Sequence, residues 1–142
     1  LQEGGQSLST TGATFAFRRR AMGVPKKIFA QRLGVSKDTL ADWEAGRLPV
    51  PDDVAAAVDE WSQRFIKRVE AGIDKTLALL AERGNDICEG VTISAYRTPE
   101  AHAAANGDGE TLYEHSAVVA SIVTGLALHG VHAQIEWRRS DG

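Results

Sequence analysis

Charged side chains with the chemistry of base recognition gather near the N-terminal end of the sequence. Lys37, Asp38 and Asp42 would lie on one short helix that begins at residue 37. A lysine ammonium can donate to guanine O6 and N7, and an aspartate can accept from cytosine N4. These side chains are therefore candidates for reading base edges in DNA. Asp38 also falls in the first helical turn, where the macrodipole stabilises a carboxylate whether or not DNA is bound.

Glycine and capping residues divide residues 11–48 into three expected helices. Thr11 and Ser36 are good N-cap residues because their hydroxyl oxygens accept a hydrogen bond from a backbone N–H of the first turn. Gly34 tolerates the positive φ that ends a helix. The pattern predicts helices over residues 11–22, 25–33 and 37–45.

The last two of these helices have the order of a helix-turn-helix. A turn that contains glycine, residues 34–36, lets two short helices cross at a steep angle. The second helix can then enter a major groove about 12 Å wide, N-terminal end first. Leu40 and Ala41 are expected to face inward. The side chains left for the groove are Ser36, Lys37, Asp38, Thr39 and Asp42.

Basic side chains flank this helix pair and are candidates for phosphate contacts. Lys26 and Lys27 begin the second helix and would position the protein on DNA without specifying a sequence. Arg47 directly follows the third helix. The three arginines at 18–20 fan out by about 100° each, so at most two of them can face DNA. Arg19 is included among the expected contacts.

The third helix also carries side chains that have structural alternatives. Trp43 is expected either to pack as a partly buried residue or to donate its indole N–H to a phosphate from that position. Glu44 is expected to pair with Arg32 or with an arginine of the first helix and so to brace the fold. Ser36 is a helix cap and also a phosphate candidate. The complete expected DNA-binding set is Lys26, Lys27, Ser36, Lys37, Asp38, Thr39, Asp42, Trp43, Arg47 and Arg19.

Charge is distributed unevenly along the 142 residues. Residues 14–48 carry eight basic and three acidic side chains, whereas residues 49–142 carry eight basic and fifteen acidic ones. A basic module followed by an acidic one predicts that only the first meets a polyanion. A chance cluster of solvated lysines and arginines is the alternative. Hydrophobic residues at 43% and charged residues at 25% fit one globular domain or two very small ones.

Simple features argue against several other classes of protein. No apolar run reaches the roughly 18–20 residues of a membrane span, so no membrane partner is expected. Residues 1–10 lack a basic and an apolar region, and we expect a polar tail or a tag remnant there instead of a secretory signal. The single cysteine, Cys88, excludes a disulfide within the chain and suits a reducing cytoplasm.

The second half of the sequence mixes helices and strands. Apolar residues at steps of three or four predict a long helix over residues 51–82. Alternating, β-branched segments predict strands. The remaining elements are strands at 91–96 and 131–137, a short helix at 98–105, and a helix at 113–128 that is apolar, and so buried, on most sides. Two strands alone are marginally stable, so this region is expected to complete itself by dimerisation.

The expected fold class is mainly α with a small α/β C-terminal part. It comprises an N-terminal helix-turn-helix domain of four to five helices, a long linking helix, and a C-terminal strand-helix-helix-strand dimerisation region. The expected boundaries are a tail over residues 1–10, the DNA-binding domain over 11–71 and the dimerisation domain over 72–142.

No motif supports catalysis or a bound metal. Among the four histidines, His129 and His132 are three residues apart, but Gly130 breaks the helix between them. No His-Glu-x-x-His pattern, phosphate loop or nucleophile motif accompanies them. We expect no enzyme activity, no metal site and no cofactor.

The helix pair resembles the helix-turn-helix of the phage-repressor/Cro superfamily, also called XRE-type. The matching features are Ala30, Leu33-Gly34-Val35-Ser36, Thr39 and Trp43-Glu44-x-Gly46. A narrower resemblance, to small repressors of the YdiL type and to anti-CRISPR-associated autorepressors, rests on Trp43 to Gly46, on Val50-Pro51-x-x-Val54, and on Tyr96-Arg97 after the long helix.

These resemblances imply a cytoplasmic bacterial or phage-encoded regulator. The relatives imply a homodimer that binds an inverted repeat in double-stranded DNA and represses transcription, often of its own operon. They further imply an origin in a phage or mobile element, or association with the bacterial nucleoid. Three alternatives stay open: an antitoxin whose acidic C-terminal half binds a toxin, a C-terminal ligand sensor or enzyme, and binding of RNA by the basic face.

Overall fold

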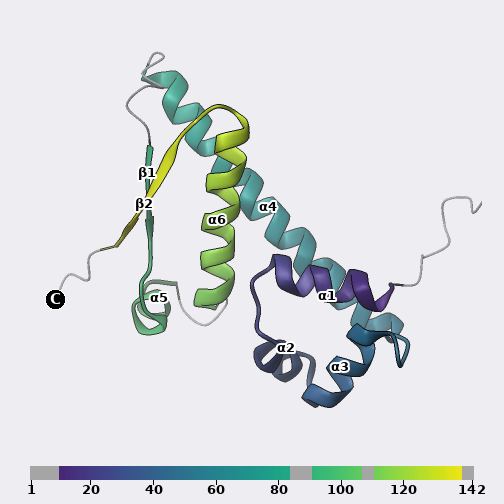
Figure 1. Cartoon of the computed structure of the whole chain (residues 1–142). Helices are drawn as coiled ribbons and strands as arrows, with labels where there is room; N and C mark the ends of the chain where they lie inside the picture. The colour runs from purple at the N-terminus through teal and green to yellow at the C-terminus, as the bar shows by residue number, and fades with distance from the viewer. Residues whose placement is uncertain (1–9, 84–90, 107–110, 139–142) are drawn as a thin grey trace, which may run out of the picture. The chain divides into compact units, whose positions relative to one another are not determined.

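The computed structural model describes residues 10–83, 91–106 and 111–138 (Figure 1). The elements follow the order α1 (Gly12–Ala21), α2 (Lys26–Leu33), α3 (Lys37–Ala45), α4 (Asp52–Glu82), β1 (Val91–Ala95), α5 (Pro99–Asn106), α6 (Leu112–Leu128) and β2 (Ala133–Trp137). The described chain is mainly helical with one small sheet, as the sequence predicts. Its C-terminal elements have the expected order strand-helix-helix-strand.

The chain divides into two compact units, residues 1–63 and 64–142, here called unit 1 and unit 2. Helix α4 runs through this division, and the boundary expected from the sequence, between residues 71 and 72, lies in the same helix. Within the described ranges no helix is both long and apolar enough to cross a membrane.

The short helices of unit 1 begin and end at local chemical signals. The Thr11 hydroxyl accepts a hydrogen bond from the Thr14 N–H at 3.0 Å, which caps α1. The Ser36 hydroxyl accepts one from the Thr39 N–H at 3.1 Å, which caps α3. Gly34 follows α2 with φ 70°, a left-handed conformation that costs glycine little. The expected bounds of α3, residues 37–45, agree with the structure.

Aromatic side chains form the core of unit 1. Phe15 from α1 and Phe29 from α2 are fully buried and meet edge to face, with ring centroids 5.6 Å apart. Trp43 of α3 meets Phe15 at 6.0 Å, and Trp61 of α4 meets Phe29 at 5.7 Å. This ring cluster joins all four helices of the unit. Its contacts in the core therefore fix the positions of α2 and α3 relative to each other.

Helix α1 approaches the end of α3 unusually closely. A Cβ placed on Gly12 would collide with the carbonyl oxygen of Trp43, lie 2.9 Å from that of Glu44 and lie 3.1 Å from the Gly46 nitrogen. All three atoms belong to the backbone, so no side chain can move to make room. Only glycine fits at this position.

Unit 2 contains a sheet of two parallel strands. Val91 pairs with Ala133, and the register continues to Ala95 and Trp137. Helices α5 and α6 form the connection between the strands, since parallel strands need a long crossover. One face of the sheet packs on a core whose buried members are Leu80, Leu126 and Val131.

Helix α6 is less buried than its composition predicts. Only Val118, Val119 and Leu126 are buried, whereas Leu128 is 84% exposed. Its exposed positions Ser116, Ala120, Thr124 and Ala127 form one stripe, and most of its other positions are only partly buried. Helix α4, helix α5 and the sheet cover these other sides within the described part of unit 2, so the expected burial on most sides is found only in part.

Helices α4 and α6 pack through two reciprocal glycine contacts. Gly72 of α4 faces the side chain of Ile122, and Gly125 of α6 faces the side chain of Ile73. Helix α4 continues through Gly72 without a break. Each isoleucine thus occupies the space where the opposite helix has no side chain.

We expect Gly125→Ala to destabilise unit 2 by about 1 kcal/mol net, because its methyl group must displace the end of the Ile73 side chain. Ile73→Val removes the terminal methyl group of that side chain. In the Ile73→Val background, Gly125→Ala should therefore lower the free energy of unfolding by about 1 kcal/mol less than it does in the wild type. A double-mutant cycle by urea unfolding measures the difference. Equal costs in both backgrounds would contradict the packing described.

Candidate nucleic-acid interface

Helix α3 buries one side and exposes the other. Leu40 is fully buried and Trp43 is 6% exposed, so this side belongs to the core of unit 1. Lys37 and Asp38, in the first turn, are exposed. The half-buried Thr39 lies next to them, and its hydroxyl is 3.0 Å from that of the exposed Ser36.

An ion pair fixes the residues at the other end of α3. The Arg47 Nε donates to Asp42 Oδ1 at 2.7 Å, with the two side chains 62% and 35% exposed. The backbone N–H groups of Arg47 and Leu48 both donate to the Asp42 carbonyl. A guanidinium has five N–H donors, and this pair uses the one on Nε. Arg47 is thus held beside the helix with a cationic surface toward solvent.

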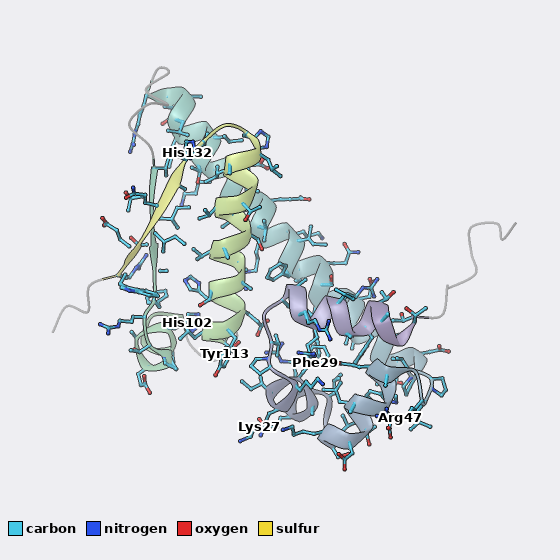
Figure 2. The ribbon with its side chains drawn as sticks, in the orientation of Figure 1. Lys27, Phe29, Arg47, His102, Tyr113 and His132 are labelled. Carbon is cyan, nitrogen blue, oxygen red and sulfur yellow. The ribbon has the colours of Figure 1, made fainter. Side chains whose placement is uncertain are left out.

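The start of α2 contributes two more exposed cations. Lys26 and Lys27 form its first turn, and both are exposed. Figure 2 shows Lys27 directed outward from α2, while Phe29, two residues later, points into the unit. Unit 1 therefore presents Lys26, Lys27, Lys37 and Arg47 on its surface.

Arg19 has a different position from the one expected. Its side chain is buried, and its Nε and Nη2 donate to the two oxygens of Glu44 at 2.7 and 3.1 Å. Its Nη1 donates to the carbonyl of Val24 at 3.0 Å. The enclosed guanidinium holds α1 against α3. The expected contact of Arg19 with DNA therefore does not fit the structure. The expected pairing of Glu44 with an arginine of the first helix is confirmed.

The neighbouring arginines of α1 point elsewhere. Arg18 lies 3.3 Å from the Asp59 carboxylate of α4, with both side chains partly exposed. The Arg20 guanidinium lies 5.1 Å from the ring centre of Phe17, a residue that is 64% exposed. The sequence predicts that the three arginines fan out, but which one turns inward depends on where α3 packs.

Trp43 lies in the aromatic core of unit 1. It is 6% exposed and meets Phe15 at 83° between the ring planes. Trp43 therefore packs as the sequence predicts, and donation of its indole N–H to a phosphate from this position stays a prediction.

Unit 2 holds a ring cluster that the sequence does not reveal. Tyr96, His102 and His115 have ring centroids between 5.1 and 5.5 Å apart, and the Arg138 guanidinium lies 4.9 Å from the tyrosine ring. His102 comes from α5 and is only 2% exposed (Figure 2). The cluster combines residues far apart in sequence, so spacing gives no sign of it.

This cluster does not form a metal centre of the ordinary kind. The part of the chain that the structure describes contains no group of three or more His, Cys, Asp or Glu side chains able to hold a metal ion. His129 and His132, the pair with suggestive spacing, are both exposed. The buried His102 packs its ring against those of Tyr96 and His115.

Comparisons with known proteins give no assignment for this surface. No protein-family model matches the chain, and no curated protein sequence matches it.

Proposed function

We propose that this protein is a sequence-specific DNA-binding regulator of transcription, acting as a dimeric repressor on an inverted repeat, with α3 in the major groove. The observation that carries the proposal is the two-sided character of α3. Leu40 and Trp43 pack its inner side into the core, whereas Lys37 and Asp38 are exposed in its first turn. A helix enters the groove with this end first.

Three further exposed cations of unit 1 suit contacts with the DNA backbone. Lys26 and Lys27 lie in the first turn of α2, where backbone N–H groups also point outward and favour an anion. Arg47 lies just beyond α3 and is oriented by Asp42. Such contacts fix the register of a protein on DNA and leave sequence reading to the base edges.

The dimer follows from the affinity that an operator requires. One short helix contacts only a few base pairs, and proteins of this kind use two half-sites about one helical turn, roughly 34 Å, apart. The resemblance of residues 24–46 to XRE-type repressors agrees with this arrangement and implies repression of the protein's own operon.

The test begins with selection of bound fragments from a random DNA pool at about 150 mM salt, a physiological value. We expect an inverted repeat to be recovered. Lys37→Ala should lose about 1–3 kcal/mol on the selected site and relax its sequence preference.

Lys26→Ala should weaken binding to all sequences alike and reduce the slope of log affinity against log salt by about one unit. Lys75→Ala, at an exposed lysine of α4 in unit 2, is the matched control and should change neither property. If Lys37→Ala and Lys26→Ala both bind the selected site as the wild type does, the proposed face of unit 1 is wrong.

A further inference from the structure

The free edge of β2 carries a row of unpaired backbone groups. The Val91 N–H donates to the His132 carbonyl, and the Arg138 N–H donates to the Ala95 carbonyl. The backbone N–H and C=O groups of successive residues in a strand point to opposite edges. The N–H and C=O groups of the even-numbered residues of β2 therefore point toward β1. The N–H and C=O groups of Ala133, Ile135 and Trp137 therefore point away from the sheet, and no described strand pairs with them.

The side chains of this edge are also unlike those of a protected strand. Ile135 is 45% exposed and Trp137 is 61% exposed. Natural sheets usually protect an open edge with charged side chains, proline or a bulge, and β2 has no lysine, no proline and a single charged side chain, Glu136. A sheet of two strands is marginal by itself, so an added strand would stabilise unit 2 as well.

We propose that β2 pairs antiparallel with β2 of a second copy of this chain, with the two-fold axis at Ile135. The residue on the axis then exchanges both backbone hydrogen bonds with its counterpart, since its N–H and C=O both face outward. Ala133 faces the partner's Trp137 and forms the same kind of hydrogen-bonded pair. All outward groups of the strand are satisfied in this register, and the result is one sheet of four strands.

The side chains of β2 are self-complementary in this register. The large Trp137 lies opposite the partner's Ala133, on the apolar face of the sheet. On the other face Gln134 lies opposite the partner's Glu136, so an amide can donate to a carboxylate. Moving the axis to Glu136 would set two like charges opposite each other and leave part of the strand unpaired. A second copy therefore fits this edge better than an arbitrary extended peptide.

The inference deepens the proposed function, because it names the surface that joins the two copies on an inverted repeat. It also stands on the geometry of β2 alone. The two proposals can therefore fail separately, because dimerisation through β2 and selection of a DNA sequence are measured independently.

Cysteine pairing tests the register directly. In a Cys88→Ser background, which removes the one native cysteine, Gln134→Cys and Glu136→Cys chains are mixed under a glutathione redox buffer. Opposite residues of a non-hydrogen-bonded pair have Cα atoms about 4.5 Å apart, within the range of a disulfide. We expect a covalent dimer from the mixture and far less from either chain alone, because like positions lie diagonally across the strands. No enrichment in the mixture would overturn the register.

Removal of one outward N–H tests the edge itself. Ile135→Pro loses a donor that faces away from β1, so the ladder within unit 2 should stay intact, as its circular dichroism will show. Sedimentation equilibrium should show dimer dissociation rising about 30-fold, from the loss of two hydrogen bonds at the axis. Ile135→Val keeps the donor and is the matched control. A monomeric wild type, or a folded proline variant that dimerises as tightly, would overturn the proposal.

DNA binding by the same samples separates the two proposals. If the Gln134→Cys and Glu136→Cys chains cross-link but the wild type selects no DNA sequence, this inference stands and the proposed function is overturned. If the wild type selects an inverted repeat but the cysteine chains do not cross-link, the proposed function stands and this inference is overturned.

Discussion

Glu44→Ala is expected to lower the free energy of unfolding of unit 1 by about 3–5 kcal/mol. The carboxylate accepts two hydrogen bonds from Arg19, and the two side chains are 6% and 9% exposed. Alanine would leave a guanidinium buried without a counter-charge, and the remaining bond to the Val24 carbonyl cannot compensate. The substitution removes an ion pair that joins α3 to α1, because Glu44 belongs to α3.

Tryptophan fluorescence during urea unfolding can measure this loss in unit 1 alone. Trp43 and Trp61 both lie in unit 1, so a Trp137→Phe background removes the signal of unit 2. Asp42→Ala is the matched control, since it breaks an arginine–carboxylate pair at the surface of the same helix. Exposed pairs contribute at most about 1 kcal/mol. Similar losses for the two variants would show that burial does not distinguish these ion pairs.

Gly12→Ala is expected to cost unit 1 about 3 kcal/mol or more. Elsewhere in a helix the same change stabilises a protein by up to about 1 kcal/mol. Here the added methyl group meets two carbonyl oxygens and an amide nitrogen at the end of α3, and backbone atoms cannot rotate away. Helix α1 would have to move off α3, which would also weaken the contact between Phe15 and Trp43.

The same fluorescence assay measures this second loss. Ala13→Gly is the matched control, because it lies next along α1 with an exposed position and should cost only about 1 kcal/mol from helix propensity. The contrast with Gly125→Ala is also informative, since truncation of Ile73 relieves that clash whereas no side-chain truncation can relieve this one. Stabilisation by Gly12→Ala would show that α1 and α3 lie further apart than described.

Local chemistry made the bounds of the short helices predictable. The Ser36 hydroxyl caps α3, and Gly34 and Gly46 follow α2 and α3 with φ of 70° and 78°. Each of these signals acts within a few residues, so the sequence alone can reveal it. Lys37 and Asp38 are exposed, as the sequence predicts, and Leu40 is buried.

Features that depend on distant residues were not predictable. Arg19 lies four residues after Phe15 and three before Met22, on the buried side of α1, but its partner is not apparent from local sequence, because the ion pair depends on where Glu44 lies after folding. The strands were expected, but their parallel pairing depends on the path of two intervening helices. The ring contacts of Tyr96 with His102 and His115 likewise arise only when β1, α5 and α6 come together.

The parallel ladder also dictates an order of events during synthesis. Val91 pairs with Ala133, and each register pair of the two strands joins positions 42 residues apart. The strands therefore cannot pair until residue 133 has been made, whereas the buried pair between α1 and α3 joins Arg19 to Glu44, 25 residues apart, and needs only the first part of the chain. As the chain leaves the ribosome, α1 to α3 can fold while β1 waits for β2 to be made. For that interval both edges of β1 are open, and an open strand edge is a template for pairing with another chain.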